Sequence, residues 1–116
     1  MPTSRSRFPK PYLLLSTVDS RKTATKLARL LVQKGLAACV NLIPNVDSYF
    51  RWKGALDQAH ELLLIIKTDS HHLKQVEQTI RTYHPYKVPE MIGWPIEWGH
   101  KPYLKWLRDS LQGQVQ

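Results

Sequence analysis

The residues with the clearest chemical potential lie in the sixteen-residue segment His84–Gly99, which reads HPYKVPEMIGWPIEWG. The segment carries an imidazole at His84 and a carboxylate at Glu90, and the only thiol of the chain is Cys39. Imidazole, carboxylate and thiolate groups are the ligands that transition metals prefer in proteins. His84, Cys39 and Glu90 are therefore the candidate ligands for a divalent cation such as Cu(II).

Each of these residues also has a structural interpretation. Cys39 lies between small and apolar neighbours, where it could simply fill space as a small hydrophobe. His84 stands at the predicted end of a helix and could close off its last carbonyls. Glu90 and Lys67 border apolar strands, so they form either an ion pair at a strand end or the polar part of a pocket. The residue pattern leaves these alternatives open.

The sequence contains none of the familiar catalytic motifs. It has no GxSxG, no Walker loop, no HExxH and no glycine-rich dinucleotide fingerprint. Its nine acidic residues show no pairing of the kind that acid–base hydrolysis needs. We therefore predict a non-enzymatic protein that requires no cofactor.

The charge and composition narrow the classes of partner. The net charge is +8, and Arg5, Arg7 and Lys10 near the N-terminus supply three of these positive charges. The remaining basic residues are scattered, so nucleic-acid binding is not predicted. The longest apolar run, LLLII at Leu62–Ile66, is far shorter than the roughly 20 residues of a membrane-spanning helix. A single cysteine and no recognisable signal peptide favour the cytoplasm.

Hydrophobic periodicity predicts the order β-α-β-β-α-β-α. Helix signals include Asp19 or Ser20 before the first helix, Asp69 or Ser70 before the second and Pro102 at the start of the third. The predicted elements are strand 12–18, helix 20–34, strand 36–43 resuming at 48–54 after Pro44-Asn45, a turn over 53–60, strand 61–68, a helix from residue 71, strand 90–97 and a helix from residue 102.

This order is that of an α+β, ferredoxin-like βαββαβ sandwich with an extra C-terminal helix. We expect one domain over residues 11–112, between a disordered tail at 1–10 and a disordered end at 113–116. The tail is basic and rich in serine and proline, but it lacks the apolar region of a targeting peptide. Two helices can cover only one face of the sheet, so the other face predicts self-association.

Taken together, several segments resemble the CutA-type divalent-cation tolerance family, over about Tyr12–Leu111. The resemblance implies a homotrimer, similar in architecture to PII-type signal proteins, that binds divalent cations, notably copper, and has no established enzyme activity. The segments that carry the resemblance are KGLAACVNLIP, SYFRWKG, LLLIIKT, HPYKVPEMI, WPIEWG and YLKWL.

The resemblance also implies where ligands bind. His84, Tyr86 and Glu90 would face a cleft between subunits, and Lys67, Tyr86 and Trp52 are the candidate lining residues of a ligand cleft. An alternative function is therefore a PII-like signalling or scaffold trimer that binds a small anionic ligand or a protein partner in these clefts.

Three positions depart from the family pattern. Lys87 stands where the family usually has an acid. Ser16 and Tyr83 stand where some bacterial members have a cysteine and a histidine implicated in copper binding. The loss of these ligands predicts weak copper binding, with a dissociation constant in the micromolar range or above.

Overall fold

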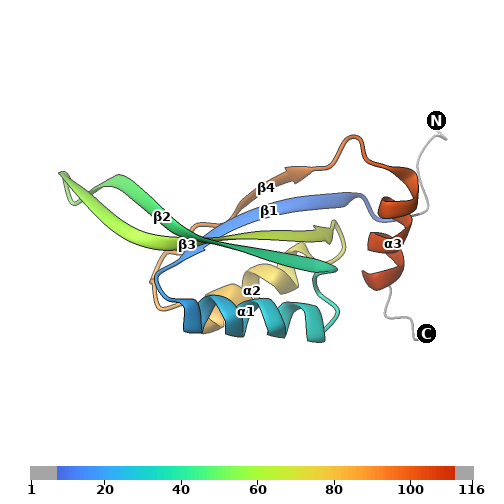
Figure 1. Ribbon diagram of the computed structural model, residues 1–116, viewed down its shortest axis with the longest axis horizontal. Helices are drawn as coiled ribbons and strands as arrows, with labels where there is room; N and C mark the ends of the chain where they lie inside the picture. Colours follow the sequence, from blue (N-terminus) through green and yellow to red (C-terminus); the bar gives the residue numbers. More distant parts are fainter. Residues whose placement is uncertain (1–7, 112–116) are drawn as a thin grey trace.

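The computed structural model describes residues 8–111, which form one four-stranded antiparallel sheet and three helices (Figure 1). The tails predicted over 1–10 and 113–116 fall largely outside the described residues. The elements are β1 (Pro11–Val18), α1 (Arg21–Gln33), β2 (Cys39–Trp52), β3 (Ala55–Asp69), α2 (Leu73–Tyr83), β4 (Ile92–Pro95) and α3 (Lys101–Leu111).

The strand order is β2-β3-β1-β4, with β1 and β3 in the centre of the sheet. These are the two strands whose sequences are apolar on both faces, as the ferredoxin-like order requires. The structure confirms the predicted α+β arrangement with an additional C-terminal helix. β4 is shorter than the predicted strand over 90–97, and Pro95 lies at its end on the edge of the sheet.

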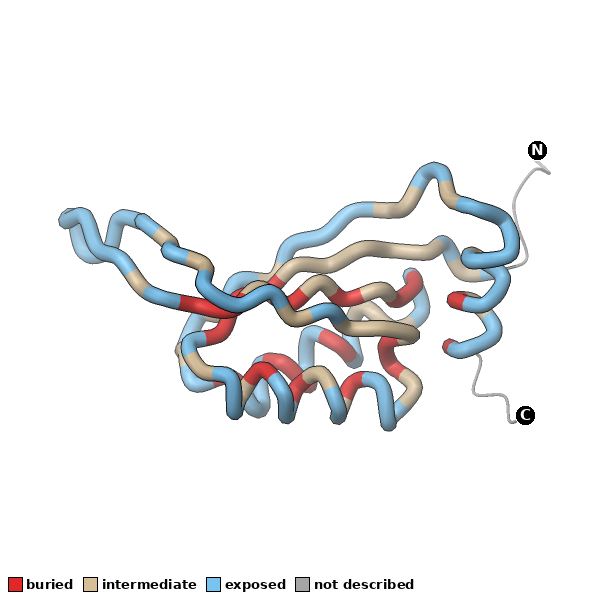
Figure 2. Tube along the Cα trace, viewed as in Figure 1, coloured by how far each residue is buried: buried red, intermediate tan, exposed pale blue. Residues whose placement is uncertain are grey.

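The hydrophobic core lies between the sheet and helices α1 and α2, which cover the same face of the sheet (Figures 1 and 2). Alternate residues of β3, Leu62, Leu64 and Ile66, point into this core because successive side chains of a strand face opposite ways. Ser20 caps α1 by accepting a hydrogen bond from the Thr23 N–H, as predicted. The core therefore holds β1, β2 and β3 against the two helices.

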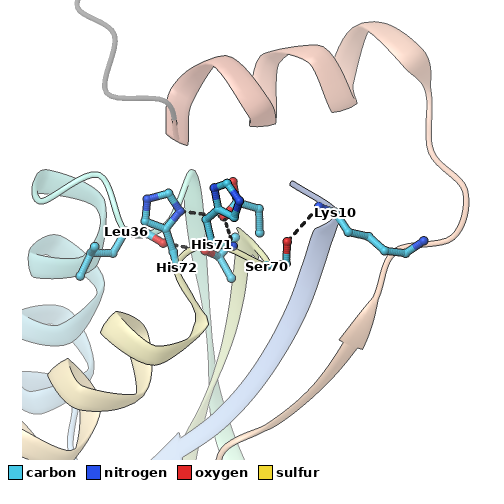
Figure 3. A network of polar contacts seen from close by, with 7 residues as sticks. Lys10, Leu36, Ser70, His71 and His72 are labelled. Carbon is cyan, nitrogen blue, oxygen red and sulfur yellow. Dashed lines mark hydrogen bonds and ion pairs between the residues drawn. The ribbon is translucent and has the colours of Figure 1, made fainter. Parts of the chain in front are cut away.

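The turn between β3 and α2 is held by a buried carboxylate and not by a side-chain helix cap (Figure 3). Asp69 Oδ1 accepts the His71 N–H at 3.0 Å and lies 2.7 Å from His72 Nδ1. Neither Asp69 nor Ser70 is the N-cap, because the helix begins after His72 and Ser70 Oγ accepts the Lys10 N–H instead. The predicted cap residues were therefore wrong, although Asp69 still organises this turn.

Strands β2 and β3 form a long hairpin that extends past the rest of the molecule (Figure 1). The predicted turn over 53–60 was wrong, because β3 already begins at Ala55 and only Lys53 and Gly54, with φ values of 50° and 81°, make the turn. Residues 56–60 are mostly polar, and most of them are exposed within the described part of the chain, so the apolar signal of a strand is missing.

The hairpin is interrupted where proline predicts an irregularity. The pairing of β2 with β3 shifts register between Ile43 and Val46, and Asn45 has a φ of 63°. This bulge separates the part of the hairpin above the core from seven further cross-strand pairs that project beyond it.

The sheet face opposite α1 and α2 is largely uncovered. Residues paired across the strands lie on the same face, and α3 packs only near one end of the sheet, where Leu107 and Leu111 are buried. We call this surface the open sheet face. Its apolar residues, all partly or well exposed, are Leu13, Leu15, Ile43, Leu63, Ile65, Ile92 and Trp94.

Ser16 faces the core and is fully buried, yet its hydroxyl has no hydrogen-bond partner among the described residues. An unsatisfied buried hydroxyl costs free energy. We predict that Ser16→Ala raises the free energy of unfolding by about 1 kcal/mol, measured by urea denaturation.

Ser48→Ala is the matched control, because the Ser48 hydroxyl does donate to a buried carboxylate, that of Glu61. This variant should lose about 2 kcal/mol. Equal losses of stability in both variants would show that the Ser16 hydroxyl is satisfied.

Candidate functional site

A polar network joins the base of the projecting hairpin to residues 84–91, the loop that follows α2. Its centre is Glu61, whose side chain is buried although the residue is charged; only 5% of Glu61 is exposed. Glu61 Oε1 accepts the Ser48 hydroxyl at 2.6 Å, and Oε2 accepts the Tyr86 hydroxyl at 2.7 Å. Two neutral donors therefore hold the carboxylate, and the one from Tyr86 attaches the hairpin to the loop.

Tyr86 is stabilised in its neutral form. Burial and, next, the hydrogen bond to the Glu61 carboxylate raise the pKa of Tyr86 well above its usual value. Its ring also lies against that of His84, with 4.6 Å between the ring centres. Tyr86 therefore acts as a donor in this network and not as an anion.

His84 is buried and both of its ring nitrogens are engaged. Nε2 lies 2.7 Å from the Thr17 carbonyl oxygen, and Nδ1 accepts the Tyr86 N–H at 3.0 Å. A carbonyl oxygen can only accept, so Nε2 carries the proton and Nδ1 carries none. The geometry fixes one neutral tautomer of His84 and leaves it no vacant lone pair.

Glu90 and His84 both form hydrogen bonds with Thr17. Its Oε1 accepts the Thr17 hydroxyl at 3.4 Å, while His84 donates to the Thr17 carbonyl. The end of β1 thus brings two of the three predicted metal ligands into one neighbourhood. Glu90 is the exposed member of the pair.

Cys39, the third predicted metal ligand, lies away from His84 and Glu90 within the same chain. It pairs with Lys67 of β3, which in turn pairs with Leu13 of β1. Thr17 is four residues farther along β1, which is roughly 13 Å at the rise of a strand. Within residues 8–111, no group of three or more histidine, cysteine, aspartate or glutamate side chains could hold a metal ion.

The three predicted ligand-cleft residues, Lys67, Tyr86 and Trp52, also lie apart from one another. Tyr86 belongs to the network at the hairpin base. Lys67 lies near α3, with its Nζ 6.0 Å from the centre of the Tyr103 ring. Trp52 ends β2 beside the projecting turn and is 56% exposed. A single chain does not bring these three side chains together.

The sequence-based reasoning missed Glu61, Ser48 and Thr17 as members of this site. One signal was present: Glu61 is an acid placed directly before the apolar run LLLII, where a charge needs partners if the strand is buried. Nothing local indicated that one partner would be Tyr86, which is 25 residues away in the chain.

Comparison with known proteins identifies the family. Residues 12–110 match the family described as CutA1 divalent ion tolerance protein. The chain belongs to the CutA1 family. Among its relatives, the divalent-cation tolerance protein CutA of Thermus thermophilus is 41% identical over 84% of this chain and 95% of its own length. Human protein CutA is 45% identical over 79% of this chain, which spans about half (51%) of the human sequence.

Solved CutA structures share the fold. The CutA1 structure from Thermus thermophilus superposes with a TM-score of 0.85 at 40% identity, covering 86% of this chain and 97% of that one. The structure of the periplasmic divalent cation tolerance protein CutA from Archaeoglobus fulgidus gives a TM-score of 0.84 at 34% identity, covering 87% and 98%. Among residues 8–111, no helix is both long and apolar enough to cross a membrane.

We predict that Tyr86→Phe lowers the free energy of unfolding by about 2 kcal/mol at neutral pH, because it leaves the buried Glu61 carboxylate short of a donor. The raised pKa of Tyr86 makes ionisation harder in the folded protein than in the unfolded one. The Tyr86 contribution is therefore complete below about pH 10 and is lost as the pH rises above that value. Urea denaturation of both proteins at pH 7.5 and pH 11 measures the difference.

Tyr83→Phe is the control, because Tyr83 is exposed on α2, away from the hairpin and the open sheet face. It should match the wild-type protein at neutral pH. A Tyr86→Phe difference that stays constant up to pH 11 would contradict the assigned hydrogen bond.

Proposed function

We propose that this chain forms a homotrimer that binds divalent cations and acts in divalent-cation tolerance, without enzymatic activity. Membership of the CutA1 family supports the cation function, since the Thermus relative that carries this name is matched over nearly its whole length. The observation that carries the proposal in this chain is the open sheet face together with the projecting hairpin, because both need a partner subunit.

The projecting hairpin is the stronger of these two features. A two-stranded hairpin alone is marginally stable in water, yet this one carries seven cross-strand pairs beyond the bulge. Its exposed apolar side chains include Tyr49, Phe50, Trp52 and Leu56. A neighbouring subunit that packs on these residues would stabilise the hairpin and cover apolar area at the same time.

Assembly would also complete the sites that one chain leaves divided. In the trimer, the hairpin of one subunit would bring Trp52 to the loop of the next subunit that contains Tyr86. Lys67 would line the cleft between these two subunits. In the same way, we propose that His84 and Glu90 bind Cu(II) or a similar ion together with Cys39 of a neighbouring subunit. Such a site would have the imidazole, carboxylate and thiolate ligands that these ions accept.

The copper site should be weak. To bind a metal, His84 must give up its hydrogen bond with Tyr86 N–H or with the Thr17 carbonyl. Ser16 and Tyr83 supply neither a thiolate nor an imidazole, and Lys87 adds positive charge to the loop. We expect a Cu(II) dissociation constant in the micromolar range or above, about −8 kcal/mol or weaker.

A second function is favoured by one observation. Lys67 lies on the sheet and forms no ion pair with an acid of residues 8–111; its ammonium lies 6.0 Å from the centre of the Tyr103 ring. An unneutralised ammonium in a cleft between subunits would suit a PII-like trimer that binds a small anionic ligand. Anion binding that depends on Lys67 and is unaffected by metals would support this alternative.

We place the protein in the cytoplasm, since its one cysteine, Cys39, is free, as is usual in a reducing compartment. The Archaeoglobus relative is described as periplasmic. Cell fractionation distinguishes the two locations.

We predict a mass three times that of the 13.5 kDa chain by light scattering at micromolar concentration. Ile65→Glu should reduce the mass to that of a monomer, because it places a charge in the middle of the open sheet face. Thr25→Glu, on the exposed side of α1, is the control and should leave the mass unchanged. A wild-type monomer would refute the assembly.

We also predict that Cu(II) titration of the full chain gives a micromolar or weaker dissociation constant, and that His84→Ala, Glu90→Gln or Cys39→Ser weakens it at least several-fold. His100→Ala removes an exposed histidine outside the proposed site and should have no effect. Nanomolar copper binding that survives His84→Ala would place the metal elsewhere.

A further inference from the structure

A groove of about 640 Å³ runs along α2 on the helix-covered side of the sheet. It lies between α2, strands β1 and β4, and the loop of residues 84–91. We call it the α2 groove. The apolar residues that line it from the inner side of the sheet, from α2 and from the loop include Leu14, Leu73, Val76, Ile80 and Met91.

The groove exists because the sheet ends early beneath α2. β4 has only four residues, and its Gly93, which pairs with Leu14, has no side chain with which to fill the space. The Leu14 side chain lies over Gly93, so a Cβ at position 93 would collide with it and with the Leu13 carbonyl. Val88 of the loop is 78% exposed and does not close the groove from above.

The rim of the groove carries two exposed cations, Arg81 and Lys87. Arg81 is in the last turn of α2, and Lys87 is in the loop. Among residues 8–111, neither side chain forms an ion pair or a hydrogen bond. The only acid among the lining residues is Glu77, so the rim has a net positive charge.

This combination fits one kind of ligand. A volume of this size is typical of small-molecule sites, whose walls are mostly apolar with a few polar groups that fix orientation. The guanidinium of Arg81 matches a carboxylate through two parallel hydrogen bonds, and Lys87 can add a third. Both cations are exposed and hydrated, so an uncharged apolar molecule gains nothing from them, whereas a carboxylate gains charge-assisted contacts.

We propose that the α2 groove binds a small amphipathic carboxylate, such as a medium-chain fatty acid. The apolar chain lies on Leu14, Ile80 and Met91, and the carboxylate meets Arg81 and Lys87 at the rim. This site is separate from the proposed metal ligands and uses none of them. The groove and the polar network share the loop of residues 84–91. Tyr86 anchors this loop to Glu61, and other residues of the loop line the groove.

The test is calorimetric titration of the full chain with octanoate and, in parallel, with 1-octanol, which has the same chain and no charge. Octanoate should bind at least tenfold more tightly. The double variant Arg81→Gln and Lys87→Gln should bind octanoate at least tenfold more weakly, to the level of octanol. Arg29→Gln, which removes an exposed arginine from α1, is the matched control and should bind as the wild-type protein does.

A second variant tests the apolar floor. Leu73→Trp fills one end of the groove and should weaken octanoate and octanol alike, with no change of mass by light scattering. The proposal is overturned if octanoate and octanol bind equally, or if the double variant keeps the preference for octanoate. It is also overturned if Leu73→Trp changes the oligomeric mass, because a second copy of the chain would then occupy the groove.

Discussion

Two helices can cover only one face of a four-stranded sheet, and much of this molecule follows from that constraint. α1 and α2 bury the inner residues of β1 and β3, while the opposite side, including Ile65 and Trp94, stays partly open. The same sheet extends into a hairpin that has no core of its own. If the proposed trimer forms, folding of the chain and association of the chains would be two parts of one process, because a neighbouring subunit would supply the burial that one chain lacks.

The buried carboxylate of Glu61 shows how the sheet transmits this geometry to the loop of residues 84–91. Its partners are hydroxyl groups, which donate hydrogen bonds without forming a salt bridge, and one of them comes from Tyr86. His84 continues the connection to β1 through Thr17. His84, Tyr86 and Glu90 of the HPYKVPE segment thus all form hydrogen bonds within one chain. A metal that bound His84 would have to replace one of these hydrogen bonds.

The sequence predicted those features that depend on local patterns. Continuous apolar runs indicated β1 and the buried half of β3, and Pro44-Asn45 indicated the bulge in β2. The length of the hairpin was not predicted, because residues 56–60 have no apolar pattern that would indicate a strand. His84 stood out as a candidate, but its acceptor Thr17 is 67 residues away, and only the folded sheet brings the two together. Its role as a saturated hydrogen-bonding group therefore could not be inferred from spacing.

The irregularities at the two outer strands have a consequence for aggregation. Regular, flat edge strands are templates on which further chains can add without limit, as in fibrils. Here the edge strand β4 is four residues long and ends in a proline that has no N–H to donate, and the edge strand β2 is broken by the bulge at Pro44 and Asn45. The four residues of β4 and the separate stretches of five and seven paired residues in β2 offer a stray strand only short ladders. A chain with so much uncovered apolar surface can thus favour closed assemblies over open-ended growth.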